Sequence, residues 1–180
     1  MKNLKPRTIE SAPEGSKENM KAIQAKRGFV TNLMAIFGNS PAVLDGYLSL
    51  ELAWEKSSFT VTEQQAILLT VSVENKCAYC IALHSSALKG TELGVQTTKA
   101  IRRRERLGEE RLDALVDLTR ELVVGRTFVA ERTKERFIAV GYNEIAVMEV
   151  LVGVAMMTIS NYLDHMAPIS IDATFQSKMH

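Results

Sequence analysis

The chain has 180 residues, of which 46% are hydrophobic and 24% are charged, a balance that excludes an intrinsically disordered protein. The formal net charge of +1 gives no general reason to expect nucleic acid or an acidic membrane as a partner. A chain of this length can bury enough surface to fold without a stabilising metal or disulfide. We expect a single domain over residues 1–180, with residues 1–15 as a flexible N-terminal segment.

The hydropathy pattern favours a cytoplasmic protein without a membrane segment. Residues 1–27 are polar and charged and do not resemble a signal peptide. The most apolar stretch, 145–159, contains Glu149 and is followed by polar residues at 160, 161 and 164. It is shorter than the roughly 20 residues that a membrane span needs. We therefore expect this stretch to be a buried helix.

The first helix signals lie in the N-terminal half of the chain. Ser40 followed by Pro41 is typical of a helix start, and apolar residues at helical spacing then predict a helix over 41–55. Thr62, with Gln65 three residues later, has the pattern of a capping box. This pattern predicts that a second helix begins at Thr62.

The helix signals continue to the end of the chain. The second helix is predicted to end at Asn75, and the next to begin at Cys77 or Ala78 and end near Gly90, which suits a left-handed cap. No alternating strand pattern or two-residue hairpin turn occurs in the sequence. We therefore predict an all-α fold, with three further helices over about 112–124, 133–140 and 143–163.

The two cysteines of the chain, Cys77 and Cys80, lie three residues apart and are followed by His84. Residues three and four apart share one face of a helix, so these side chains form a stripe in which the sulfurs can approach disulfide range. A helix start also favours thiolate over thiol through its free N–H groups and its dipole. In the cytoplasm such a pair is more often catalytic or metal-binding than structural.

These residues predict a thiol oxidoreductase. His84, one turn after Cys80, can accept the Cys80 proton or stabilise the thiolate as an imidazolium. Attack of Cys80 on a hydroperoxide gives a sulfenic acid, with which Cys77 condenses to form a disulfide. We expect no cofactor beyond this redox-active cysteine pair.

The helix that contains residues 66–72, followed by the Cys77-x-x-Cys80-x-x-x-His84 spacing, resembles the alkyl hydroperoxidase D (AhpD)-like, carboxymuconolactone decarboxylase superfamily. Residues 139–142, the apolar helix after them and the segment 161–165 are also similar, so that the resemblance spans about residues 15–172. The resemblance implies a compact multi-helix fold and homo-oligomers, either trimers or hexamers. It also implies a thiol peroxidase or disulfide reductase that takes a hydroperoxide as substrate and a thiol of dihydrolipoyl type as electron donor.

Two positions depart from the family pattern. Gln65 stands where the family commonly has a glutamate that joins the histidine in a proton relay, and Tyr79 stands where AhpD itself has a histidine. A glutamine can orient His84 by hydrogen bonding but cannot accept a proton. The predicted catalytic residues are therefore Cys80, Cys77, His84 and Gln65, and the departure bears on peroxide turnover more than on the fold.

Three other interpretations stay open. Cys77, Cys80 and His84 could bind zinc, with His165 or water as the fourth ligand, although structural zinc sites usually draw paired ligands from two segments. The chain could instead be a non-catalytic helical protein that oligomerises through its apolar helices. A carboxymuconolactone decarboxylase-like enzyme is the third possibility, and its chemistry does not need a cysteine pair. The basic stretch 102–106 has acidic neighbours and no interleaved aromatic residues, so we interpret it as a solvated helix face.

Overall fold

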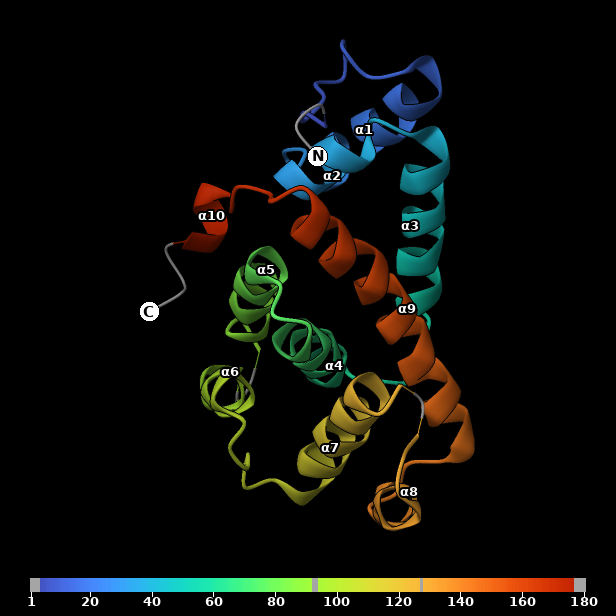
Figure 1. Cartoon of the computed structure of the whole chain (residues 1–180), viewed down its shortest axis with the longest axis vertical. Helices are drawn as coiled ribbons and strands as arrows, with labels where there is room; N and C mark the ends of the chain where they lie inside the picture. Colours follow the sequence, from blue (N-terminus) through green and yellow to red (C-terminus); the bar gives the residue numbers. More distant parts are fainter. Residues whose placement is uncertain (1–3, 92–93, 127, 177–180) are drawn as a thin grey trace.

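The computed structural model describes residues 4–91, 94–126 and 128–176, and within this part of the chain every regular element is a helix (Figure 1). Since no strand occurs among the described residues, the predicted all-α class is confirmed. In chain order the helices are α1 (Glu14–Arg27), α2 (Asn32–Phe37), α3 (Pro41–Trp54), α4 (Val61–Glu74), α5 (Ala78–Leu88), α6 (Gly94–Arg103), α7 (Glu110–Val124), α8 (Glu131–Ala139), α9 (Glu144–Met166) and α10 (Ala173–Gln176).

Helix α4 is the centre of the core. It packs against α5, α6, α7 and α9, and its residues Ile67, Leu69 and Val71 are completely buried. The long α9 lies with α3 on one side and α4 and α5 on the other (Figure 1). The contact of α4, α5 and α9 is where the cysteine pair lies, so the best-packed part of the molecule also holds the predicted site.

The N-terminal segment predicted over residues 1–15 lies partly outside the described residues, which begin at residue 4. Within its described part, the Arg7 backbone N–H donates to the carbonyl of Ala35 at 2.9 Å. The Arg7 side chain donates to Asn39 Oδ1 at 2.7 Å. These bonds join the segment to α2 and to the turn that follows it.

The start of α4 corrects the predicted capping box. The N-cap is Thr60, whose hydroxyl accepts from the Glu63 N–H at 3.3 Å, while the Glu63 carboxylate accepts from the Thr60 N–H at 2.8 Å. A carboxylate at the positive end of the helix is a stronger partner than the amide of Gln65. Thr62 and Gln65 therefore lie inside the helix, and the Gln65 side chain is available for another contact.

A left-handed residue separates α4 from α5. Lys76 has φ 58°, its N–H donates to the Val73 carbonyl at 3.1 Å, and the Cys77 N–H donates to the Ser72 carbonyl at 3.0 Å. These two bonds are those of a Schellman motif, in which the left-handed position usually holds glycine. The motif ends α4 and fixes the direction in which Cys77 enters α5.

Helix α5 ends near Gly90 as predicted, but the left-handed cap predicted there is wrong. Helix α5 ends at Leu88, and Lys89 is the C-cap with a right-handed φ of −59°. The Gly90 N–H donates to the Ala87 carbonyl at 3.2 Å, so the chain continues through right-handed turns. Because these turns satisfy the last carbonyls of α5, no left-handed glycine is needed.

Helix α9 is longer than the apolar stretch that predicts it. Asn143 caps it as predicted, accepting from the Ala146 N–H at 2.9 Å, and the helix then runs for 23 residues. By length and composition it could cross a membrane, although the core helix of a soluble protein passes the same test. Its buried side carries apolar residues in the middle and polar residues toward the C-terminal end, namely Val150, Gly153, Met157, Ser160, Asn161 and Asp164.

We expect Gly153 to be required for the packing of α9 against α3. A Cβ atom at this position would lie 3.0 Å from the Trp54 ring and 3.3 Å from Ile67. Gly153→Leu should therefore lower the free energy of unfolding by about 1–3 kcal/mol, measured by chemical denaturation. Gly46→Leu in α3 is the matched control, because a Cβ there meets nothing within 4 Å. An equal loss in both variants would contradict the prediction.

Candidate functional site

Cys77 is the N-cap residue of α5. Its sulfur accepts a hydrogen bond from the Cys80 backbone N–H at 3.2 Å, and its thiol donates to Asp164 Oδ2 at 3.3 Å. Cys77 is completely buried, and Cys80 is 1% exposed. Both are free thiols, and the first turn of α5 holds them together as the sequence spacing predicts.

The two thiols are electrostatically unequal. The hydrogen bond from the Cys77 thiol lowers the pKa of Cys80 below its ordinary value, in spite of burial, and contacts with Ser160 and Asn161 act in the same direction. The same bond with Cys80, followed by burial, raises the pKa of Cys77. Cys77 has one proton and two acceptors, Cys80 and Asp164, and both favour its staying protonated. The pair therefore consists of a thiolate-prone Cys80 and a protonated Cys77.

Three polar residues of α9 surround the sulfurs, and sequence reasoning did not assign them to the site. Ser160 Oγ lies 3.6 Å from the Cys80 sulfur, and Asp164 contacts Cys77. Asn161 accepts from the Asn75 amide at 3.0 Å, while its buried Nδ2, whose contact with Cys80 lowers the pKa of that thiol, has no other partner among the described residues. All three α9 side chains are buried. The sequence shows that this apolar helix has polar residues toward its end, but no spacing in the sequence connects them with the cysteines.

His84 and Gln65 form a separate pair. His84 Nδ1 lies 3.0 Å from Gln65 Oε1, which implies that Nδ1 carries the proton and that Nε2 is an acceptor. Among the hydrogen bonds of the described residues, none joins His84 to either sulfur. Burial lowers the pKa of His84 to about 3, so the imidazole is neutral near pH 7. His84 is thus a neutral group beside the cysteines.

A pocket of about 310 Å³ reaches the site from the α1–α3 side. His84 and Gln65 line it together with Tyr47 and Trp54. Burial, and then the charge of Cys80, raise the pKa of Tyr47, so this phenol is close enough to the reactive sulfur to sense its charge. Neither cysteine lines the pocket, so a small molecule in it contacts Tyr47 and His84 and is separated from Cys80 by side chains.

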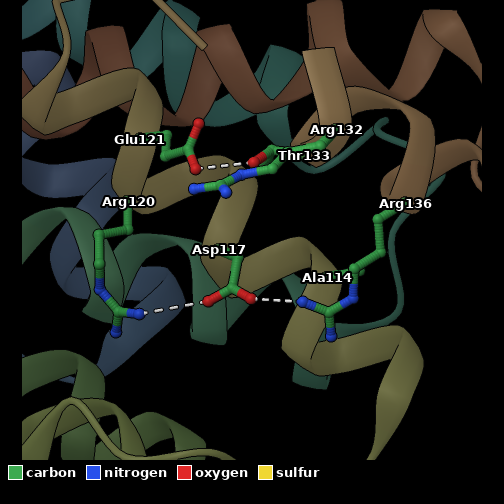
Figure 2. Close-up of a pocket in the computed structure, with 7 residues that line it drawn as sticks. All are labelled: Ala114, Asp117, Arg120, Glu121, Arg132, Thr133 and Arg136. Atoms are coloured by element: carbon green, nitrogen blue, oxygen red, sulfur yellow. Dashed lines mark hydrogen bonds and ion pairs between the residues drawn. The ribbon is translucent and has the colours of Figure 1, made fainter. Parts of the chain in front are cut away.

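A second pocket, of about 440 Å³, lies between α7 and α8 and contains none of the predicted site residues (Figure 2). Asp117 accepts from Arg120 at 3.4 Å and from Arg136 at 2.6 Å, and Figure 2 shows the two arginines reaching it from opposite sides. Glu121 accepts from the Thr133 hydroxyl at 2.7 Å. Because these carboxylates are already paired, we interpret this pocket as a gap between α7 and α8 whose polar side chains hold the two helices together.

The geometry does not favour zinc. No group of three His, Cys, Asp or Glu side chains that could hold a metal ion occurs among the described residues. His165, the possible fourth ligand, uses its Nε2 to bond the Asn75 carbonyl at 2.6 Å. Tyr79 points its hydroxyl to Asp172 at 2.7 Å and so joins α5 to the C-terminal segment.

Comparison with solved structures identifies the fold. An AhpD-core peroxidase-related protein of Ralstonia eutropha JMP134 has a TM-score of 0.81 and 18% identity over 93% of this chain and 90% of its own. The chain has the AhpD-like fold. A peroxidase-related protein of Silicibacter sp. TM1040 gives a TM-score of 0.79 and 17% identity over 91% of this chain and 87% of its own.

The debrominase Bmp8 also shares the AhpD-like fold, with a TM-score of 0.81 and 15% identity over 99% of this chain and 96% of its own. No protein-family model and no curated protein sequence matches the chain. The AhpD-like fold therefore serves more than one kind of chemistry, and the activity of this chain has to be inferred from its own residues.

We expect the burial of His84 to make the protein sensitive to mild acid. The folded state keeps His84 neutral down to a pKa of about 3, whereas the unfolded chain takes up a proton below the ordinary value of 6.5. Stability is therefore fully present above pH 6.5 and is lost as the pH falls. The loss at pH 5 should be about 2 kcal/mol, measured by urea denaturation. It should largely disappear in His84→Asn and persist in the control His165→Asn, while a pH-independent parent would refute it.

Proposed function

We propose that the protein is a dithiol oxidoreductase that reduces hydroperoxides, with Cys80 as the nucleophile and Cys77 as the resolving thiol. The observation that carries this proposal is that the pKa values of the two cysteines are shifted in opposite directions. The sulfur of Cys80 accepts hydrogen bonds that lower its pKa, while Cys77 holds its proton. A two-cysteine peroxidase needs this order, because the first sulfur must attack as a thiolate before the second one resolves it.

The proposed reaction has two steps. The Cys80 thiolate attacks the distal oxygen of the hydroperoxide, the O–O bond breaks, and the alkoxide leaves and takes up a proton from solvent as the alcohol. Cys80 is then a sulfenic acid. The Cys77 sulfur attacks it, the S–O bond breaks, and a disulfide and one water form. An external thiol, which we propose to be of dihydrolipoyl type, returns two electrons and restores the dithiol.

The pocket suits a small organic hydroperoxide. Its lining combines apolar side chains with the polar groups of Tyr47, Gln65 and His84 and with the ion pair of Arg27 and Glu51. The Tyr47 hydroxyl and the His84 Nε2 can hold the two oxygens of the substrate while its organic part packs against Leu68 and Trp54. We propose that no metal or organic cofactor takes part and that the protein works in the cytoplasm, where external thiols keep such pairs reduced.

The match to Bmp8 supports a second candidate function. A dithiol that transfers two electrons can also reduce a carbon–halogen bond, and a protein with the AhpD-like fold is a debrominase. The neutral His84–Gln65 pair does not favour peroxide over such a substrate. Assays with an organic hydroperoxide and with a brominated aromatic compound, each in the presence of a dithiol reductant, separate the two functions.

We expect Cys77→Ser to trap the first intermediate. Serine is a good N-cap residue, so α5 should keep its start while the resolving thiol is lost. One equivalent of hydroperoxide should then leave a Cys80 sulfenic acid, which a dimedone-type probe captures and mass spectrometry detects. Cys80→Ser is the matched control and should give no adduct. An adduct on Cys77 in that control, or undiminished peroxide consumption, would reverse or refute the assigned roles.

We also propose that the protein is a homo-oligomer in solution. Along α9 a row of large apolar side chains is exposed to solvent, and a near-neutral surface of this kind gives little protection against self-association. The row consists of Ile145, Met148, Leu151, Ile159 and Tyr162. Trimers and hexamers are the assemblies that the family resemblance implies.

Light scattering should therefore give a multiple of the 20.0 kDa chain mass. Met148→Lys should shift the assembly toward the monomer, because a charge in an apolar interface is not compensated. Val124→Lys in α7 is the matched control, since Val124 is 66% exposed and Met148 is 67% exposed. A parent protein that is monomeric at micromolar concentration would refute the proposed assembly.

A further inference from the structure

The resolving step poses a proton problem that the cysteines alone do not solve. Cys77 must lose its proton to attack the oxidised Cys80, yet it is completely buried and cannot release a proton directly to bulk water. In the reduced pair the hydrogen bond with Cys80 and then burial raise the pKa of Cys77, and the burial remains when Cys80 is oxidised. The second thiol therefore needs a base inside the protein.

We propose that Asp164 is this base: it takes the Cys77 proton during attack on the oxidised Cys80, and when the disulfide is reduced it receives the proton of the incoming thiol and passes it to Cys77. Asp164 Oδ2 lies 3.3 Å from the Cys77 sulfur, which is hydrogen-bond distance for a thiol. The other oxygen, Oδ1, accepts from the Ile169 N–H at 2.9 Å. This second bond holds the carboxylate in place, and the inference rests on the proposed cysteine-pair chemistry.

The other candidate bases near Cys77 are held elsewhere. His84 bonds Gln65 and has no bond to a sulfur among the described residues. His165 uses Nε2 on the Asn75 carbonyl. Glu74, at the end of α4, is paired with Arg104 and Arg120 at 3.1 and 3.0 Å. Among these groups, Asp164 is the one in contact with the resolving sulfur.

Asp164 and its α9 neighbour Asn161 complete the step. As Cys77 attacks, the S–O bond of the Cys80 sulfenic acid breaks and hydroxide leaves with the electron pair. The proton that Asp164 has taken converts this hydroxide into water, so that the disulfide forms with no net charge. The buried Asn161 Nδ2, which has no partner other than Cys80 among the described residues, can bond the oxygen carried by Cys80 before it leaves.

The test compares Asp164→Asn with the control Asp172→Asn. Asparagine keeps the size of the side chain and the bond to Ile169 but cannot take a proton. Asp172 lies between α9 and α10, accepts from the Tyr79 hydroxyl at 2.7 Å and from the Asn32 N–H at 3.1 Å, and makes no hydrogen bond to either sulfur within the described part of the chain. Both variants are mixed with one equivalent of cumene hydroperoxide and quenched at intervals with a dimedone-type probe.

We expect Asp164→Asn to form the Cys80 sulfenic acid within about twofold of the parent rate and to resolve it about 100-fold more slowly, as for loss of a general base. The probe then captures Cys80 although Cys77 is present. Asp172→Asn should resolve like the parent, and Asp164→Glu should recover part of the rate. Resolution at the parent rate in Asp164→Asn, or equal slowing in Asp172→Asn, overturns the proposal.

A second measurement does not depend on peroxide. The disulfide is prepared with diamide, and its reduction by 2-mercaptoethanol is followed by mass spectrometry. Attack on Cys80 makes Cys77 the leaving thiolate, so loss of the Asp164 proton donor should slow this reaction as well. If no variant forms a sulfenic acid but Asp164→Asn still slows the exchange, the peroxidase function fails while the role of Asp164 stands. Exchange at the parent rate overturns that role.

Discussion

Cys77 occupies the N-cap of α5, a position at which most helices place a serine, threonine, aspartate or asparagine oxygen. Its sulfur takes the Cys80 N–H that would otherwise be one of the free donors of the first turn. This single bond fixes the distance between the two cysteines, and the left-handed Lys76 before it fixes their direction. A non-glycine residue in that conformation costs on the order of 1 kcal/mol, which the buried packing of α4 and α5 offsets.

The cap also determines what the rest of the core must supply. Solvent does not reach the two thiols buried between α4, α5 and α9. Each charge that forms on a sulfur therefore has to be stabilised by a fixed polar group of the protein. Helix α9 provides these groups on one face, with Ser160 and Asn161 near Cys80 and Asp164 on Cys77. At Gly153, α9 lies directly against Trp54. This close approach to the core brings the polar face of α9 to the cysteines.

Local patterns predicted the fold class and the cysteine pair because both depend on short-range geometry. The period of apolar residues and the i, i+3 spacing of Cys77 and Cys80 follow from helix geometry alone. Helices α1, α2, α6 and α10 escaped prediction, since α1 and α6 are largely polar and α2 and α10 are very short. Helices α1, α2 and α6 are stabilised by the residues that they bury against neighbouring helices, which no local pattern contains, whereas α10 buries none of its residues.

The same limit explains the errors within the site. Thr60 and Thr62 both have an acceptor three residues later, and only the fold decides that Glu63 rather than Gln65 closes the cap. The polar residues of α9 lie about 80 positions from the cysteines, with 80 residues separating Ser160 from Cys80 and 87 separating Asp164 from Cys77. No spacing rule connects groups so far apart, so Asp164 could be recognised as a site residue only after folding.

Gln65 distinguishes this site because it leaves His84 without a negatively charged partner. Where the family resemblance places a glutamate, an amide oxygen receives the His84 N–H, so no negative charge holds a proton on the imidazole. His84 therefore stays neutral in its buried position and can orient a substrate, but it is a weak base. The carboxylate that the site still needs is found on α9, where Asp164 touches the resolving sulfur instead of the histidine. If Asp164 is the proton-transfer group, as we propose, this group lies on the helix that covers the cysteines and not on the helix before them. We therefore expect the chemistry of this chain to be controlled at the second thiol rather than the first.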